Sequence, residues 1–245
     1  MVIEAKDLSF SYPGKHVLRD ISLTVERADF LGITGSTGSG KTTLAMCFNG
    51  LIPKSVKGKF SGSVSVMGAD TRKSRISDLA KKVGFVFQDP DWQLFSLTVR
   101  DEVSFGLQNL GMKGIDRRVR ESLRMVGLSG YEGTEPHRLS QGQKQKLCIA
   151  SVLAMEPEII ILDEPTSQLD YRSSMNVYGI LRKLNESGKT VIVIEHNTDL
   201  LAEYANKVLL LDGGRAARLG QAMQVLSDKR LLGRLGVKLP WVCMK

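Results

Sequence analysis

The sequence predicts an α/β fold in which a phosphate-binding loop follows a buried strand. Three observations support this prediction. An apolar strand that starts at Leu31 runs into a glycine-rich turn, and a helix begins near Lys41. Two later apolar segments, 159–162 and 191–194, are each followed by polar side chains, which would lie at the carboxyl edge of the sheet, where open α/β sheets bind ligands. Between the loop and these segments, residues 91–156 change to a partly helical spacing of apolar side chains.

Composition places few further limits on the chain. Its 245 residues allow one large domain with a subdomain, and 42% hydrophobic and 24% charged residues are ordinary values for a globular protein. No apolar run approaches the ~20 residues that span a bilayer, and the first residues lack the pattern of a signal peptide, so we expect a cytoplasmic chain. The formal charge of +8 favours an anionic partner, which could be a nucleotide, a nucleic acid or an anionic membrane surface.

The cysteines indicate a reducing compartment. Cys47, Cys148 and Cys243 are scattered, odd in number and without metal-ligand spacing. The first two lie in apolar helical contexts and are expected in the core.

The chain before the loop predicts an antiparallel β-layer. Residues 2–10 and 17–25 each alternate between apolar and polar side chains, as half-buried strands do. Tyr12 lies on the turn between them and has two interpretations. Its ring can stack on a nucleotide base, or it can cap the local core.

The loop itself matches G-x-x-x-x-G-K-[ST]. Its glycines let backbone N–H groups converge on phosphate oxygens, and the following helix adds the positive end of its dipole. Lys41 is placed for the β- and γ-phosphates and the Thr42 hydroxyl for Mg²⁺. The predicted nucleotide-binding residues of this segment are Gly35, Ser36, Thr37, Gly38, Ser39, Gly40, Lys41, Thr42 and Thr43.

Three strand ends supply candidate catalytic side chains. The basic stretch 54–62 is expected as a loop, and short strands at 63–67 and 83–87 lead to Gln88 at the sheet edge. The apolar segment before Asp163 and Glu164 predicts that the first carboxylate holds Mg²⁺ and the second polarises a water molecule. His196 follows a further buried strand and is a candidate sensor of the γ-phosphate.

A second helix start is also suited to phosphate. Ser140 is a good N-cap for the apolar helix that follows, and exposed N–H groups at a helix start form an anion site. An ordinary capped helix is the alternative interpretation. The residues concerned are Ser140, Gln141, Gly142 and Gln143.

These segments predict the domain organisation. Residues 1–90 and 157–226 would form a nucleotide-binding core with its β-layer, 91–156 an inserted helical subdomain, and 227–245 a basic C-terminal tail. The arginine-rich face within 117–124 is expected to be solvated.

Taken in order, the motifs resemble those of the ATP-binding cassette (ABC) ATPases over about residues 2–225. Tyr12 is similar to the family's adenine-stacking aromatic, 35–42 to its Walker A loop and Gln88 to its Q-loop glutamine. Further along, 139–143 is similar to the signature motif, 160–164 to Walker B with the catalytic glutamate, 167–170 to the D-loop that ends in Asp170, and His196 to the switch histidine. Two residues depart from the usual pattern: Gln141 stands where the signature usually has glycine, and Gln168 where a small residue is commoner.

The resemblance implies a P-loop NTPase of the ABC-ATPase fold, with a RecA-like core, an N-terminal antiparallel β-subdomain and an inserted α-helical subdomain. It implies ATP hydrolysis with catalytic roles for Glu164, His196, Gln88 and Lys41. Mg²⁺ would be held by Thr42, Gln88 and Asp163. Two subunits, identical or different, would pack head to tail, so that the signature residues and Asp170 of one approach the ATP of the other.

The segment 85–95, continuing to Gly106, resembles one branch of the family, the ATPase components of energy-coupling factor (ECF) and cobalt or nickel importers. This likeness implies integral membrane coupling and substrate-binding subunits, a peripheral place on the cytoplasmic face of the cell membrane, and uptake of a vitamin, metal ion or other micronutrient. Trp92, Leu94 and Phe95 either border the groove for a partner helix or belong to the subdomain core.

An exporter subunit and a soluble ABC ATPase acting on nucleic acid are the alternatives. Nucleic acid is the less favoured partner, because the chain holds one ATPase unit and only 140 − 88 = 52 positions separate Gln88 from Ser140. That interval accommodates a helical subdomain but no long coiled coil.

Overall fold

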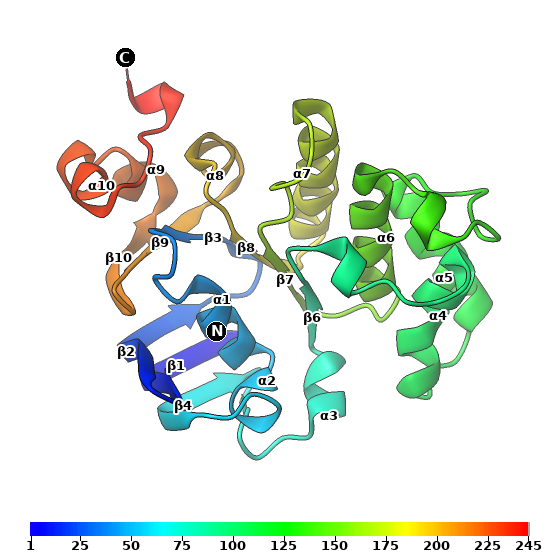
Figure 1. The fold of residues 1–245 in the computed structure, drawn as a ribbon, viewed down its shortest axis with the longest axis horizontal. Helices are drawn as coiled ribbons and strands as arrows, with labels where there is room; N and C mark the ends of the chain where they lie inside the picture. Colours follow the sequence, from blue (N-terminus) through cyan, green and yellow to red (C-terminus); the bar gives the residue numbers. More distant parts are fainter. Residues whose placement is uncertain (245) are drawn as a thin grey trace.

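The computed structural model describes residues 1–244, and two sheets organise it (Figure 1). The smaller sheet has the order β2-β1-β4-β5 and is antiparallel. The larger sheet has the order β10-β9-β3-β8-β7-β6. The strands of the smaller sheet are β1 (Ile3–Tyr12), β2 (Lys15–Val25), β4 (Lys59–Val66) and β5 (Ala69–Asp70).

The larger sheet is parallel from β9 to β6, and β10 pairs antiparallel at its edge. Strands β3, β7 and β8 are buried along their whole length, which explains their continuous apolar runs. Because these strands are parallel, their carboxyl ends meet at one edge. The strands are β3 (Phe30–Gly35), β6 (Val83–Val86), β7 (Ile159–Asp163), β8 (Thr190–Ile194), β9 (Lys207–Asp212) and β10 (Arg215–Gln221).

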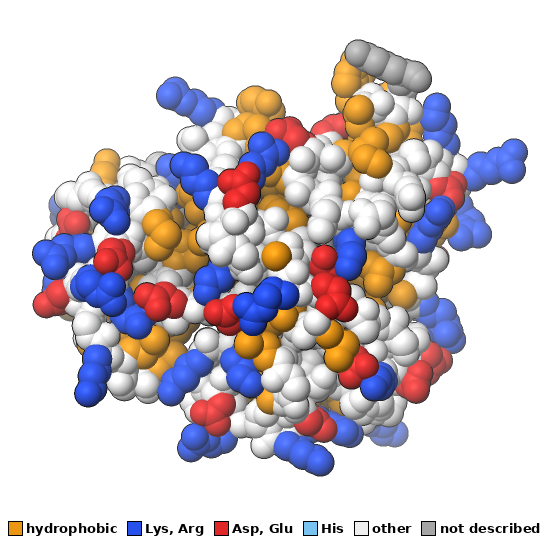
Figure 2. Space-filling model, turned by 180° about the vertical axis from the view of Figure 1, so that it is seen from behind, with side chains coloured by type: hydrophobic (Ala, Val, Ile, Leu, Met, Phe, Trp, Pro, Cys, Tyr) orange, Lys and Arg blue, Asp and Glu red, His pale blue; other side chains and the backbone are white. Residues whose placement is uncertain are grey.

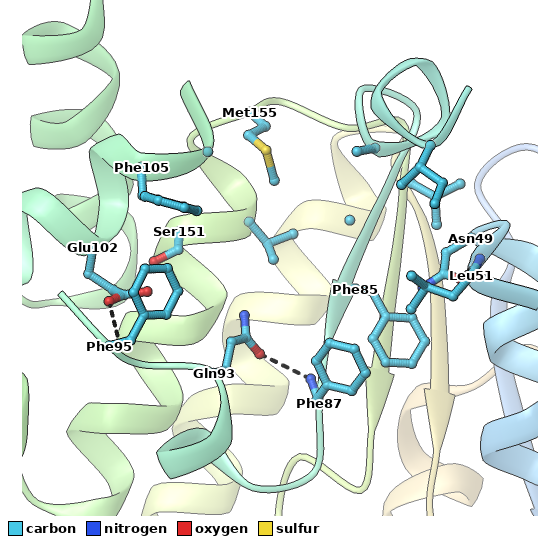
Figure 3. A pocket seen from close by; sticks show the side chains of 16 residues that line it. Asn49, Leu51, Phe85, Phe87, Gln93, Phe95, Glu102, Phe105, Ser151 and Met155 are labelled. Carbon is cyan, nitrogen blue, oxygen red and sulfur yellow. Dashed lines mark hydrogen bonds between the residues drawn. The ribbon is translucent and has the colours of Figure 1, made fainter. Parts of the chain in front are cut away.

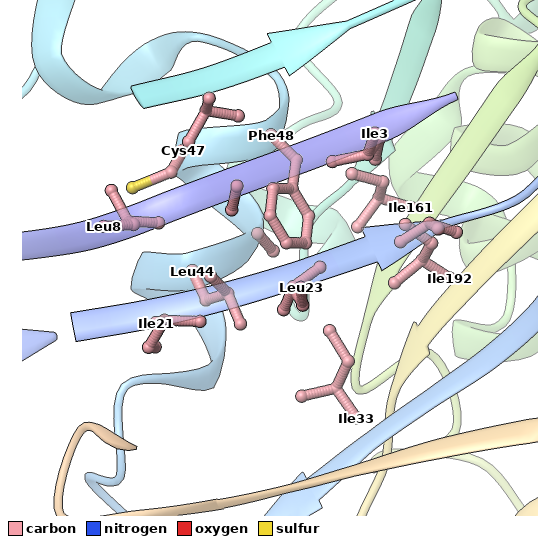
Figure 4. Close-up of a cluster of buried hydrophobic side chains, with 14 of the residues drawn as sticks. Ile3, Leu8, Ile21, Leu23, Ile33, Leu44, Cys47, Phe48, Ile161 and Ile192 are labelled. Carbon is pink, nitrogen blue, oxygen red and sulfur yellow. The ribbon is translucent and has the colours of Figure 1, made fainter. Parts of the chain in front are cut away.

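Helix α1 (Lys41–Phe48) packs between the two sheets (Figure 4). Its Leu44 and Phe48 lie in one buried cluster with Ile21 of the smaller sheet and Ile192 of the larger one. The glycine-rich loop therefore leads directly into a helix that packs against both sheets.

The segment after β6 is mostly helical. Helices α4 (Val99–Asn109), α5 (Ile115–Val126) and α6 (Gln141–Leu153) pack on one another at one end of the molecule (Figure 1). Their apolar faces form a second buried cluster, which reaches β7 and β8. The remaining helices are α2 (Leu51–Lys54), α3 (Ile76–Ala80), η1 (Pro90–Trp92), η2 (Pro136–Arg138), α7 (Tyr171–Glu186), α8 (Thr198–Tyr204), α9 (Ala222–Leu226), α10 (Lys229–Leu235) and η3 (Trp241–Cys243).

Two expectations from the sequence were wrong in detail. The stretch 54–62 is not all loop, because β4 already begins at Lys59. Gly62 lies opposite a bulge in β1, where Asp7 and Leu8 face this one residue of β4. Its φ is +78°, and a Cβ there would lie 2.3 Å from the Asp7 carbonyl oxygen, so this position needs glycine. Nor is the basic face of α5 entirely solvated, since Arg118 donates to the Ala154 carbonyl oxygen at 3.1 Å and pairs with Glu156.

The C-terminal segment folds against the core instead of extending from it as a tail. Leu232 and Leu235 of α10 are buried in a third apolar cluster with Leu201 and Leu226. On the face shown in Figure 2, Lys and Arg side chains are spread among acidic ones and do not gather in one patch. Among residues 1–244, no helix combines the length and apolar character that a bilayer crossing requires.

Candidate nucleotide site

The glycine-rich loop between β3 and α1 has the conformation of a phosphate cradle. Gly35, Gly38 and Gly40 all have positive φ. A Cβ on Gly35 would lie 2.0 Å from the Leu211 carbonyl oxygen, so the loop needs glycine at that position. Gly40 is the N-cap residue of α1, and no side chain caps that helix start. The first N–H groups of α1 therefore have no side-chain acceptor competing with an anion.

Lys41 lies inside this loop. Its Nζ donates to the carbonyl oxygens of Gly35 and Ser36, both at 3.0 Å. Burial lowers the pKa of Lys41, while Glu164 and Asp163 oppose this effect. The ammonium is thus partly desolvated and held by neutral acceptors that a phosphate oxygen can replace.

Three of the predicted catalytic side chains meet in one hydrogen-bonded group. Glu164 Oε2 accepts from Gln88 Nε2 at 2.8 Å, and Glu164 Oε1 lies 3.0 Å from His196 Nε2. They come from the ends of β6, β7 and β8, three neighbouring strands of the larger sheet. Glu164 has a φ of +46°, a left-handed backbone conformation that is unusual outside glycine.

Asp163, one residue earlier, is a buried carboxylate with one unpartnered oxygen. It is 3% exposed, and its Oδ1 has no hydrogen-bond partner. Burial raises the pKa of Asp163, while a hydrogen bond with Thr42 and the charge of Lys41 oppose this effect. An orphaned carboxylate oxygen beside a threonine hydroxyl is the donor set that Mg²⁺ prefers, so these two residues fit the predicted ion.

A cavity of about 290 Å³ joins these parts. Lys41, Thr42, Glu164 and His196 line it, together with Thr37, Gly38, Gly40 and Thr43 of the loop. Tyr12 lines it too, and its hydroxyl lies 3.3 Å from Thr43 Oγ1. The same ring packs edge-on against Phe10 at 5.0 Å, so Tyr12 faces the cavity and the core at once.

The signature residues lie elsewhere. Ser140 caps α6: its Oγ accepts from Gln143 N at 3.3 Å, and Gln143 Oε1 accepts from Ser140 N at 2.9 Å. None of residues 140–143 lines the nucleotide cavity. A Cβ on Gly142 would lie 3.1 Å from Ser173 Oγ, and Asp170, the N-cap of α7, accepts from that same hydroxyl at 3.0 Å. The signature and the D-loop are thus neighbours within one chain.

Sequence reasoning missed Glu195, which precedes the candidate switch histidine. This carboxylate is 3% exposed; it accepts from His196 N at 2.9 Å and also from the Thr166 hydroxyl. Burial raises the pKa of Glu195, and these hydrogen bonds oppose the rise. An acid at the end of a buried apolar strand was the available signal, since Asp163 ends β7 in a similar way.

A phosphate loop, an acid-ended buried strand and a glutamate–glutamine–histidine group on one sheet edge define a P-loop ATPase. The ABC transporter family model matches residues 18–167, and the chain belongs to that family. It is an ABC ATPase that binds ATP, the ATPase subunit of an ABC transporter.

Its relatives include ATPases of the ECF branch of this family. Over 244 residues it is 44% identical to a putative ABC transporter ATP-binding protein of Pyrococcus abyssi, covering 98% of this chain and 87% of that protein. It is 40% identical to the energy-coupling factor transporter ATP-binding protein EcfA of Methanothermobacter thermautotrophicus, covering 98% and 77%. The resemblance to ECF-type ATPases is thereby confirmed.

Solved structures agree with the fold. CbiO1 of Clostridium perfringens, described as part of the ABC transporter complex cbiONQ, superposes with a TM-score of 0.83 at 32% identity, covering 99% of this chain and 97% of that one. The ATP-binding cassette MJ0796, a dimer bound to ADP and Pi, gives a TM-score of 0.78 at 29% identity, covering 90% and 98%. The predicted ABC-ATPase fold is confirmed.

Proposed function

We propose that this chain is the ATP-hydrolysing subunit of an ECF-type importer on the cytoplasmic face of the cell membrane. Two subunits, identical or different, would pack head to tail and drive uptake of a vitamin, metal ion or other micronutrient. The substrate would be chosen by an integral membrane subunit. The single observation that carries the proposal is the Gln88–Glu164–His196 group at the edge of the loop cavity.

This group gives Glu164 its role. Hydrogen bonds from Gln88 and His196 hold the carboxylate at the cavity, where it can polarise a water molecule for attack on the γ-phosphate. Lys41 and the N–H groups of the loop bind the phosphates and stabilise the negative charge that develops on them. Gln88 and His196 orient the base and sense whether the phosphate is present.

Thr42 and Asp163 would hold Mg²⁺, and Gln88 is the third predicted ligand. When bound, the ion supplies positive charge against the phosphate oxygens. It would also provide the partner that Asp163 Oδ1 lacks.

The position of the signature supports a two-copy site. Ser140 caps a helix whose first residues do not line the loop cavity of their own chain, yet this helix start is a second terminus suited to an anion. A neighbouring copy packed head to tail would bring that terminus to the phosphates bound by the loop.

The membrane partner would dock in a separate, largely apolar cavity of about 300 Å³ between β6, η1 and α4 (Figure 3). Phe85, Phe87, Phe95 and Phe105 line it, and Phe95 is 65% exposed. Two of its lining side chains are hydrogen-bonded to backbone: Gln93 accepts from Phe87 N at 3.2 Å, and the buried Glu102 accepts from Phe95 N at 3.0 Å. An amphipathic helix of a membrane subunit is the occupant that suits such aromatic walls.

The structure separates the three residues considered for this groove. Phe95 lines the cavity, whereas Leu94 packs against the helical core. Trp92, the last residue of η1, is exposed and does not line the cavity. The groove interpretation therefore suits Phe95, and the core interpretation suits Leu94.

The first test uses Glu164→Gln. This variant should bind Mg-ATP, form a stable dimer on gel filtration and hydrolyse ATP about 10²–10⁴-fold more slowly than the wild type. Lys41→Ala should fail to dimerise because it binds nucleotide poorly. Undiminished turnover by Glu164→Gln would contradict the role given to Glu164.

The second test concerns the partner. Integral membrane proteins should co-purify with the tagged wild type from detergent-solubilised membranes, and Phe105→Asp should lose them while its ATP affinity is kept. Arg117→Gln, on the exposed face of α5, is the matched control and should retain them. Hydrolysis stimulated by nucleic acid, with no membrane partner, would overturn the importer proposal.

A further inference from the structure

Asp91 ties the segment after Gln88 to the start of helix α6. Its Oδ1 accepts from Lys144 Nζ at 2.6 Å, and its Oδ2 accepts from Gln141 Nε2 at 3.4 Å. Lys144 and Gln141 both lie in the first turns of α6, beside the N-cap Ser140. One carboxylate therefore holds the helix start through both of its oxygens.

This contact is shorter and less exposed than the i,i+4 ion pair of helix α5. The Lys144 side chain is 14% exposed, whereas the i,i+4 pair of α5, Arg117 and Glu121, is 63% and 41% exposed and longer at 3.4 Å. Asp91 itself is half exposed, but its backbone is fixed, because Asp91 N donates to Asp89 Oδ1 at 3.0 Å. The bond to Lys144 is also the main reason that the pKa of Asp91 is lowered.

The contact accounts for the departure in the signature. A glycine at position 141 has no side chain to offer, whereas Gln141 reaches Asp91 across 50 positions of sequence. The glutamine amide is therefore engaged with its own chain and is turned to η1.

Gln88, three residues before Asp91, is also hydrogen-bonded to another part of the chain. Gln88 donates to Glu164, and three residues later Asp91 holds α6. Residues 88–91 thus form a bridge between the catalytic carboxylate of one ATP site and the helix whose start is offered to the other.

We propose that Asp91 is a positioning residue that couples the Gln88–Glu164 contact of its own ATP site to the signature helix serving the second copy. The proposal rests on the head-to-tail dimer proposed above. A change in the Gln88–Glu164 contact moves residues 88–91, and Asp91 transmits that movement to Ser140 through Lys144 and Gln141.

The test is made in the full chain carrying Glu164→Gln, with two readouts. One is ATP affinity, measured with a fluorescent ATP analogue at protein concentrations below dimerisation. The other is the dimer dissociation constant with Mg-ATP, measured by analytical ultracentrifugation. Asp91→Ala should weaken the dimer about fivefold with ATP affinity unchanged, a loss typical of a partly buried ion pair.

The partners of Asp91 provide the second variants. Lys144→Met should weaken the dimer as Asp91→Ala does, and the double variant should be no weaker than either single one, because all three lose the same link. Lys144→Arg should restore most of the dimer, and Gln141→Gly should cost about twofold. The same cycle on Arg117→Gln and Glu121→Gln should leave the dimer unchanged.

The outcomes separate the two proposals. Failure of the Glu164→Gln chain to dimerise with ATP would overturn the two-copy site and the coupling together. If it dimerises, additive losses from Asp91→Ala and Lys144→Met, a full-strength dimer in both, or an equal loss of ATP affinity would overturn the coupling role alone.

Discussion

Strands β7 and β8 lie side by side in the larger sheet. A buried acid ends β7 and another follows β8, yet the two acids differ in their hydrogen bonding. Asp163 of β7 has an oxygen with no hydrogen-bond partner, whereas Glu195 after β8 accepts from His196 N and the Thr166 hydroxyl. Both are 3% exposed, and burial raises the pKa of both. Burial and pKa direction therefore do not distinguish them, but the hydrogen bonds do.

The difference teaches what each acid is for. A buried carboxylate with unmet bonding capacity is costly unless a cation completes it, so we expect Asp163 to bind a ligand. Glu195 has its partners within the chain and holds the backbone of the candidate switch histidine to the segment that follows Glu164. Asp163 is expected to take part in the reaction, and Glu195 is expected to hold the backbone around the site in place.

Asp163→Asn gives the largest expected effect. It should lower kcat of the Mg²⁺-dependent ATPase about 10²–10³-fold, a loss typical of removing one preorganised electrostatic contact. Without nucleotide and metal, its Tm should be equal to or above that of the wild type, because an unpartnered charge is no longer buried. Steady-state ATPase assays and calorimetry in EDTA make both measurements.

Asp212→Asn is the matched control for that prediction. Asp212 ends strand β9 of the same sheet but is exposed, so the same loss of charge should change neither activity nor Tm. If Asp163→Asn retained activity, or lowered Tm by several degrees, the contrast between the two acids would fail.

Glu195→Gln should show the opposite pattern. Glutamine keeps one acceptor for Thr166 but directs an NH₂ group toward His196 N–H, leaving buried donors unpaired. Loss of such a bond costs about 1–3 kcal/mol, or roughly 3–9 °C in Tm for a chain of this size. Thr166→Val should give part of the same loss, and the exposed Glu186→Gln on α7 should give none. An unchanged Tm for Glu195→Gln would show that its hydrogen bonds do not hold this corner of the fold.

These two acids also show how far sequence reasoning reaches. The strands, the loop and the helical insertion could be predicted because their signals are local: apolar runs, glycine spacing and helical period. Asp163 was found because a phosphate loop upstream gave its strand a meaning. Glu195 and Asp91 were not found, because Thr166 lies 29 positions from Glu195 and Lys144 lies 53 positions from Asp91, and only the tertiary fold brings each pair together. The stretch 54–62 was misjudged for a related reason, since a glycine such as Gly62 can lie in a strand opposite a bulge as readily as in a loop.

The dependence of stability on pH offers a smaller test. The pKa of Asp163 is raised from 3.8, so its contribution to stability is full below that pH and is lost as pH rises through the folded-state pKa. In EDTA, wild-type protein should therefore lose stability relative to Asp163→Asn as the pH rises from about 4 to the folded-state pKa, by about 1.4 kcal/mol for each pH unit between the two pKa values. Glu195 is present in both proteins, so its own raised pKa cancels. Urea unfolding across this range makes the comparison, and parallel curves would contradict it.

The smallest effect is expected at Tyr12, which contacts neither Asp163 nor Glu195. If its ring stacks on adenine, Tyr12→Ala should weaken ATP binding by about 0.5–1.5 kcal/mol, or roughly 2–12-fold, while Tyr12→Phe loses only the contact of the hydroxyl with Thr43 and binds almost normally. If the ring serves mainly as a cap on Phe10, Tyr12→Ala should lower Tm and leave affinity unchanged. Titration with a fluorescent ATP analogue, beside a melting curve for each variant, separates the two interpretations. A loss of affinity without a loss of Tm would place Tyr12 with Asp163, among side chains whose bonding is completed by the ligand, and the reverse would place it with Glu195.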